Sequence, residues 1–191
     1  MDNENKTEIE ETQRTPLRYH ETLDAFSDVI EEYYYGREID VYRTAVTNPP
    51  TEFDITPKRR RNAGEQGQEL PFVYTQEEID LMDKEDKKIE VGRDALSVHK
   101  TELKEIKEAK RSAVDFGKKH TVEETENYKY NQRGAYVMKL HITPDKALVS
   151  KKFHSGTGHG NILLREGITI EDIWDKSYEL KPFKYDEDDK Q

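Results

Sequence analysis

Apolar residues recur at helical spacing in two long segments of the chain. In residues 19–35 they lie three or four positions apart, as in Leu23, Phe26 and Ile30. Gly36 follows this segment at the position expected for a helix C-cap. The pattern therefore predicts an N-terminal helix that ends near Tyr35.

A second helical pattern begins after Thr101, whose hydroxyl can cap a helix, and runs to about Phe116, followed by Gly117. Its apolar face is expected to consist of Leu103, Ile106, Ala109, Ala113 and Phe116. The residues from Thr75 to Glu78 have the form of a capping box, which predicts a short acidic helix through Met82.

Alternating apolar positions indicate strands that become more frequent toward the end of the chain. The expected strands are residues 39–45, 70–74, 95–98, 136–142, 147–149 and 162–164. The period of residues 168–174 fits a strand or a helical turn, and the polar residues 57–69 and 118–134 are expected to be loops. Helices early and mid-chain with strands late predict an α+β fold.

The 191 residues are enough for one domain with extensions at its ends. We expect a mobile polar arm over residues 1–16, a single α+β domain over residues 17–182, and an acidic tail over residues 183–191. The tails are expected to be disordered, since charged residues make up 38% of the chain and hydrophobic ones only 32%.

The formal charge of −10 argues against non-specific binding of nucleic acid, which requires an excess of Lys and Arg. It favours instead a basic protein as a partner. Cysteine is absent, which excludes disulfides and thiol chemistry. No apolar run reaches the length of a membrane span and the N-terminus is acidic, so we expect a cytoplasmic bacterial or phage protein without a membrane partner.

Four consecutive cations, Lys58 to Arg61, stand out in the segment expected to be a loop. Such a run can bind phosphate or RNA. In an acidic protein it can equally be a solvated loop, and the sequence leaves its role open.

The segment from Phe153 to Leu164 combines three glycines with His154, His159 and Asn161. Glycines of this kind allow the backbone to approach a ligand closely, and imidazoles supply hydrogen-bond donors. The two histidines are five residues apart but no cluster of carboxylates accompanies them, so we expect no metal site.

Arg43 lies inside an expected strand, between Tyr42 and Thr44. An arginine within a sheet either faces water at an edge or is held by a partner. The second alternative would place a guanidinium in a cleft, where it can bind a phosphate group through two hydrogen bonds.

The order of these segments resembles the Arg-Ser-Glu layout of ADP-ribosyltransferase-like proteins. The matching positions are Tyr42-Arg43-Thr44, Leu96-Ser97-Val98 and His159 to Leu164, so that the resemblance covers roughly residues 40–170. It implies a small split antiparallel sheet with N-terminal and central helices. It also implies NAD as the cofactor, with Arg43 on the phosphates and Ser97 bracing the nicotinamide pocket.

The chain departs from this layout where the family has its catalytic Glu, because that position is occupied by Asn161 and the position two residues earlier by His159. An asparagine cannot supply the charge that stabilises an oxocarbenium-like ribose. Two alternatives follow: a relative that only binds its ligand, or an enzyme of NAD-dependent ribosyl transfer or hydrolysis that uses His154 or His159 as catalytic residues.

We therefore expect a domain that binds a nucleotide-like or phosphate-bearing ligand through Arg43, Thr44, Ser97 and Asn161. The alternative is an acidic accessory or inhibitory protein that acts by protein–protein interaction, without chemistry. Nucleic acid is not expected as a partner.

Overall fold

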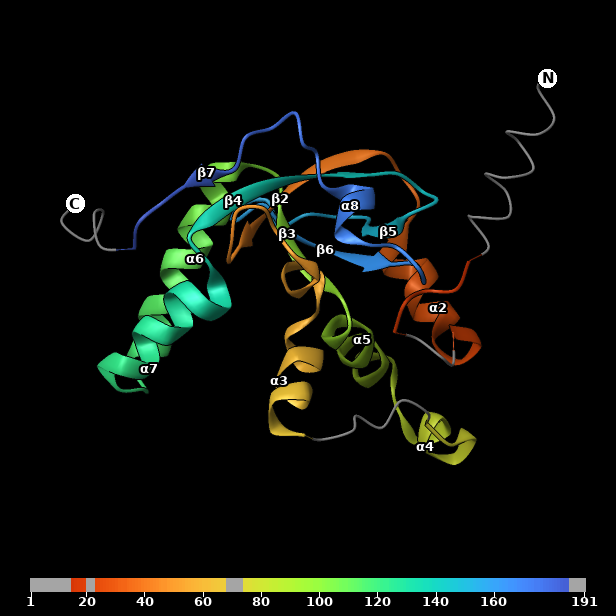
Figure 1. Cartoon of the computed structure of the whole chain (residues 1–191). Helices are drawn as coiled ribbons and strands as arrows, with labels where there is room; N and C mark the ends of the chain where they lie inside the picture. The colour runs from red at the N-terminus through yellow and green to blue at the C-terminus, as the bar shows by residue number, and fades with distance from the viewer. Residues whose placement is uncertain (1–14, 20–22, 68–73, 186–191) are drawn as a thin grey trace, which may run out of the picture.

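The computed structural model describes residues 15–19, 23–67 and 74–185 of the chain. The expected strand at 70–74 lies almost entirely outside these residues, as do most of the expected arm and the tail from residue 186. The described strands form one antiparallel sheet, and helices lie on both of its faces (Figure 1), so the expected α+β class is confirmed. The strands are β1 (Tyr34–Tyr35), β2 (Ile39–Ala45), β3 (Leu96–His99), β4 (Tyr136–Ile142), β5 (Ala147–Ser150), β6 (His159–Leu164) and β7 (Lys181–Pro182).

The sheet has the order β1-β5-β6-β3-β2-β4-β7 and is split between β3 and β2. Strand β2 pairs with β4 along its whole length, and β3 likewise pairs with β6. The two halves meet through the single pair Tyr42 and His99. Beyond this pair β2 and β3 diverge, which leaves space between the halves of the sheet.

Apolar side chains on the two faces of the sheet form separate cores. One core contains Val41, Leu140 and Ile162 and is closed by α8 (Ile170–Ile173) and η1 (Glu52–Ile55). On the opposite face Leu163 packs against α2 (Leu23–Tyr33) and α5 (Lys84–Arg93). Figure 1 shows α2, α5 and α6 (Glu102–Gly117) on this second side of the sheet, while α8 lies on the first.

Helix α6 begins at the expected cap, where Thr101 accepts a hydrogen bond from the backbone of Lys104. Its buried face differs from the expected one, because Leu103 is 68% exposed. Ala109 and Ala113 are buried as expected, and Glu105 lies on the same face one turn earlier, so that the buried residues are at i, i+4 and i+8. The two alanines allow the helix to lie close to the sheet, and Glu105 is buried with them.

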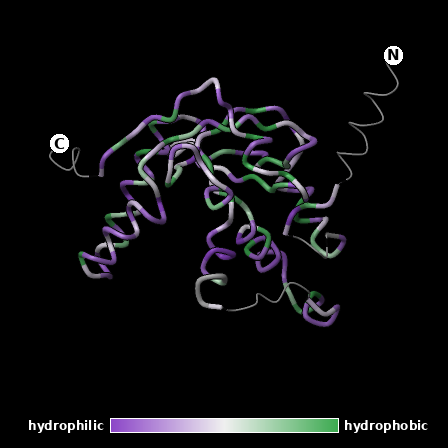
Figure 2. Tube along the Cα trace, in the orientation of Figure 1, coloured by the Kyte–Doolittle hydropathy of each residue, from purple (hydrophilic) through white to green (hydrophobic). Residues whose placement is uncertain are grey.

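The expectation of a loop over residues 57–69 was wrong, because the structure has a helix, α3 (Lys58–Gln66). This helix is mostly hydrophilic (Figure 2) and lacks the apolar stripe that sequence patterns detect. Ion pairs hold it in place: Arg59 pairs with Glu90 at 2.9 Å, and Arg60 with Asp94 at 3.0 Å.

The expected loop over residues 118–134 is also helical. A capping box at Thr121 starts α7 (Val122–Asn127), which continues into a π-helical turn, η2 (Tyr128–Arg133). Short helices also occur at α4 (Gln76–Leu81), as expected, and at α8, where the ambiguous segment 168–174 proves helical. Helix α5 was not expected.

The packed chain extends beyond the expected boundary at residue 182. Phe183 and Tyr185 pack against α6, and the Tyr185 hydroxyl donates a hydrogen bond of 2.6 Å to the Gly134 carbonyl. The start of the expected acidic tail is therefore part of the domain. None of the described helices has the length and apolar character needed to cross a bilayer.

Candidate functional site

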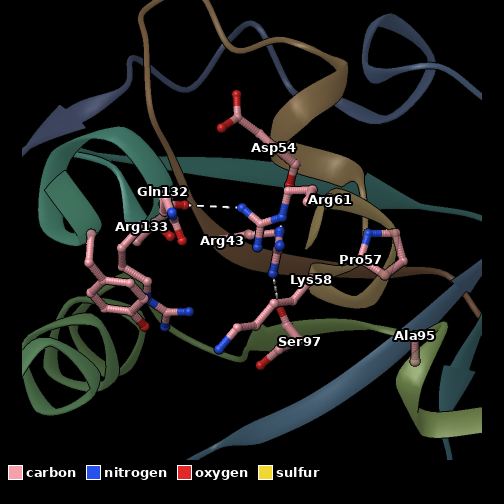
Figure 3. Close-up of a pocket in the computed structure, with 11 residues that line it drawn as sticks. Arg43, Asp54, Pro57, Lys58, Arg61, Ala95, Ser97, Gln132 and Arg133 are labelled. Carbon is pink, nitrogen blue, oxygen red and sulfur yellow. Dashed lines mark hydrogen bonds between the residues drawn. The ribbon is translucent and has the colours of Figure 1, made fainter. Parts of the chain in front are cut away.

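A cavity of about 160 Å³ lies where the two halves of the sheet diverge (Figure 3). It is bounded by β2, β3, η1, α3 and η2. Four cationic side chains reach it, together with one carboxyl-bearing residue and several polar or small residues. Its lining residues are Arg43, Thr44, Asp54, Pro57, Lys58, Arg61, Ala95, Ser97, Tyr128, Gln132 and Arg133.

Arg43 spans the gap between the two halves of the sheet. Its Nε donates a hydrogen bond of 2.6 Å to the Asp54 carbonyl, and its Nη1 donates one of 2.7 Å to the Ser97 carbonyl. The second bond satisfies a β3 carbonyl at the point where β2 no longer pairs with it. The remaining nitrogen, Nη2, has no acceptor among the described residues and is available to a ligand.

The pKa of Arg43 is lowered to about 10, and burial is the main cause. The charge of Glu105 opposes this shift, and the charges of Arg61 and Arg133 contribute to it. The guanidinium remains charged at neutral pH. It therefore carries a desolvation cost and repulsion from two neighbours, both of which a bound anion would relieve.

Two carboxylates accompany these cations, and both are largely engaged by the protein. The Asp54 carboxylate accepts hydrogen bonds from the backbone N–H groups of Thr51 and Val46, at 2.8 and 2.9 Å. In Figure 3 it points away from Ser97. Glu105 accepts a bond of 3.1 Å from the backbone of Thr44 and lies 3.6 Å from Arg133.

The described residues around the cavity thus carry four positive charges against two negative ones. This local excess of positive charge occurs in a chain whose formal charge is −10. It matches the charge of a phosphate dianion.

The cationic run on α3 divides between two directions. Arg59 pairs with Glu90 of α5 and Arg60 with Asp94, the residue that follows α5, whereas Lys58 and Arg61 face the cavity. Lys58 is exposed and forms no ion pair with the described residues. The run is thus neither a solvated loop nor a uniform basic patch, since half of it fixes the helix and half lines the cavity.

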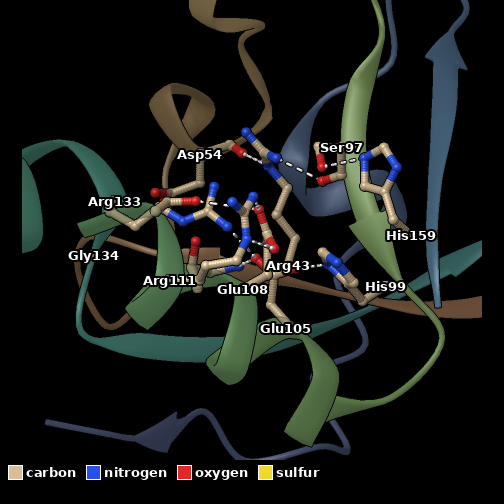
Figure 4. A network of polar contacts seen from close by, with 12 residues as sticks. Arg43, Asp54, Ser97, His99, Glu105, Glu108, Arg111, Arg133, Gly134 and His159 are labelled. Atoms are coloured by element: carbon tan, nitrogen blue, oxygen red, sulfur yellow. Dashed lines mark hydrogen bonds and ion pairs between the residues drawn. The ribbon is translucent and has the colours of Figure 1, made fainter. Parts of the chain in front are cut away.

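Ser97 connects the cavity to two histidines (Figure 4). Its Oγ lies 2.8 Å from His159 Nε2, and the imidazole rings of His159 and His99 are 5.4 Å apart. His99 is fully buried, and its Nδ1 forms a short hydrogen bond with Glu105. Desolvation lowers the pKa of His159, and the neighbouring His99 adds to this, so His159 is neutral at pH 7.

The structure brings together only some of the residues predicted from sequence. Arg43, Thr44 and Ser97 line the cavity, and His159 contacts Ser97 from behind. The other two lie elsewhere. His154 is exposed, and its Nδ1 accepts hydrogen bonds from its own loop, while Asn161 lines a second cavity of about 380 Å³ beside Tyr34.

Several residues of the site were not predicted from the sequence, among them Arg133, Arg61 and Glu105. Arg133 lies in the helical segment expected to be a loop, and Arg61 in a run whose role stayed open. Glu105 could have been found, because it precedes Ala109 and Ala113 at a spacing of four residues on one helix face.

Comparison with known proteins gave no match to this chain among family models, curated proteins or solved structures.

Proposed function

We propose that this domain binds a ligand through a phosphate group held in the cavity at the split in the sheet. The observation that carries the proposal is the convergence of Arg43, Arg61 and Arg133 on one small cavity, with Lys58 at its rim. Arginine offers planar pairs of N–H donors that match phosphate oxygens. Ser97 and Gln132 add polar groups to the same lining.

The size of the cavity favours a phosphate group over a whole nucleotide. Pockets for drug-sized ligands measure roughly 300–1,000 Å³, and this one measures about 160 Å³. A single phosphate fits, with the remainder of the ligand outside. NAD and ADP-ribose, the ligands suggested by the ADP-ribosyltransferase resemblance, are therefore candidates for partial insertion and are tested beside simpler phosphates.

The proposal is limited to binding and does not extend to ribosyl transfer. Asn161 occupies the position that the resemblance assigns to the catalytic Glu, and it lines a different cavity from Arg43. Ribosyl transfer would therefore lack the carboxylate charge that the resemblance implies, and the residue at that position does not lie in the cavity of Arg43.

The proposal is tested by isothermal titration calorimetry with inorganic phosphate, AMP, ADP-ribose and NAD. We expect binding of phosphate and tighter binding of at least one of the organic phosphates. The Lys58→Gln variant should bind about three- to tenfold more weakly, because one charge-assisted contact contributes about 1 kcal/mol at an exposed rim.

Lys107→Gln is the matched control, since Lys107 is an exposed lysine of α6 that does not line the cavity. It removes the same charge from the protein and should leave the affinity unchanged. Absence of heat with all four ligands at low salt would contradict the proposal, as would equal weakening by both variants.

A further inference from the structure

The contact between Ser97 and His159 suggests a role beyond holding a ligand. Ser97 is one of the residues that line the cavity, and its Oγ lies 2.8 Å from His159 Nε2, on the side away from the cations. A serine hydroxyl paired with a neutral imidazole is the arrangement that activates serine as a nucleophile. Here it adjoins a group of arginines suited to a phosphate.

We propose that Ser97 is a nucleophile for phosphoryl transfer from phosphomonoesters, with His159 as its general base. The inference rests on the proposed phosphate site. It adds an activity to that site and names its substrate class, esters that carry a terminal phosphate.

The reaction follows from the position of the groups. Ser97 Oγ attacks phosphorus while its proton passes to His159 Nε2, and the bond from phosphorus to the ester oxygen breaks. The alcohol leaves with the bonding electrons and takes a proton from water at the mouth of the cavity, and His159 returns its proton to solvent. Water then attacks the phosphoserine, and phosphate leaves as the Ser97 hydroxyl is restored.

The surrounding groups suit each of these demands. Arg43 donates a hydrogen bond of 2.7 Å to the Ser97 carbonyl, so its guanidinium lies beside the residue that carries the nucleophile. Arg61 and Arg133 line the same cavity, where they would balance the charge on the equatorial oxygens. The buried pair of His99 and Glu105 lies behind His159 and acts as a positioning element, not as a group in contact with substrate.

The state of His159 depends on several charged neighbours. Burial and the rings of His99 and His154 disfavour its protonation, and Glu108 and Glu105 oppose them. Burial prevails, which keeps the pKa below its ordinary value of 6.5. The base form is therefore present at neutral pH and is lost only on acidification below that value.

The experiment uses 4-nitrophenyl phosphate with the full-length protein at low salt. We expect release of 4-nitrophenol and, after acid quench, a phosphoserine that peptide mass spectrometry assigns to Ser97. The Ser97→Ala and His159→Gln variants should each slow release by about 10²-fold or more. The rate of the wild-type protein should decrease as the pH is lowered, because His159 becomes protonated, and the midpoint of this decrease should lie below pH 6.5.

Two control variants remove the same side-chain types elsewhere. Ser155→Ala changes an exposed serine of the loop before β6, and His141→Gln an exposed histidine of β4. Both should retain the wild-type rate.

The outcomes separate the two proposals. Phosphate binding by the wild type without nitrophenol release or phosphoserine overturns the nucleophile and leaves the proposed function standing. Equal rates in wild type and Ser97→Ala also overturn it. Failure of the wild type to bind phosphate at all rejects both.

Discussion

Replacing Glu105 by alanine is expected to lower the free energy of unfolding by about 3–5 kcal/mol. Glu105 is 1% exposed and satisfies three groups at once: the backbone N–H of Thr44, His99 Nδ1 and the charge of Arg133. Its removal leaves the buried donors of Thr44 and His99 and the half-buried charge of Arg133 without a counterpart, which costs more than the lost attraction alone. Urea denaturation followed by Trp174 fluorescence measures the change.

Two further variants make this test specific to the buried carboxylate. Glu108→Ala removes a carboxylate one turn later on α6, where it pairs with the exposed Arg111, and should cost less than about 1 kcal/mol. Glu105→Gln keeps an acceptor for the Thr44 N–H, so its loss of unfolding free energy should lie between those of Glu105→Ala and Glu108→Ala. Equal losses in Glu105→Ala and Glu108→Ala would show that the buried network does not stabilise the fold.

The network also implies a direction of pH dependence. Burial would raise the pKa of Glu105, but the hydrogen bond from His99 and the charges of Arg133 and Arg43 outweigh it and lower the pKa below its ordinary value of 4.5. A carboxylate with a lowered pKa stabilises the fold above the ordinary value, and this contribution is lost as the pH falls through the lowered one. The stability gap between wild type and Glu105→Gln should therefore narrow below pH 4.5.

Substitution of Gly134 by alanine is expected to cost about 3 kcal/mol or more. Its φ of 98° and ψ of 174° belong to a region that residues with a Cβ avoid, and an added Cβ would lie 2.2 Å from the Ala45 carbonyl oxygen. The turn cannot relax freely, because the Gly134 carbonyl accepts the Tyr185 hydroxyl. The variant should also weaken phosphate binding, since the displaced turn carries Arg133.

Gly92→Ala provides a control of opposite sign. Gly92 lies within α5, and an added Cβ there meets nothing within 4 Å. Alanine at such a helical position stabilises by about 0.5–1 kcal/mol. Thermal unfolding of both variants tests the pair, and a loss of similar size in each would contradict the steric argument at Gly134.

Sequence patterns predicted the elements whose stability comes from burial of an apolar face. Strands β2 and β4 have the expected bounds, because alternate residues such as Val41 and Leu140 enter the core. Helix α3 was not predicted because it has no periodic apolar face and is held by ion pairs to Glu90 and Asp94 instead. Ion pairs between segments that are distant in sequence form only in the folded chain, so they leave no local pattern from which a helix could be predicted.

The site shows the same division. Arg43, Ser97 and His159 were predicted and lie together. Arg43 and His159 were found because an arginine inside a strand and a histidine in a glycine-rich segment are unusual in sequence, and Ser97 was found through the resemblance to the Arg-Ser-Glu layout. Asn161 was predicted from the resemblance to that layout, and it pairs with Ser97 across the strands β3 and β6, yet it lines another cavity. Arg133 depended on a π-helical turn, for which the sequence offers no comparable pattern.

The split sheet has a consequence for motion. Its two halves share one backbone pair, Tyr42 with His99, and elsewhere along the divergence side chains such as Arg43 substitute for ladder hydrogen bonds. The two half-sheets are therefore joined by a short hinge and by hydrogen bonds from charged side chains, and not by a continuous ladder of backbone hydrogen bonds. The backbone amide hydrogens of the two half-sheets are expected to exchange with solvent as separate cooperative units. An anion bound in the cavity would contact both half-sheets and stabilise their association.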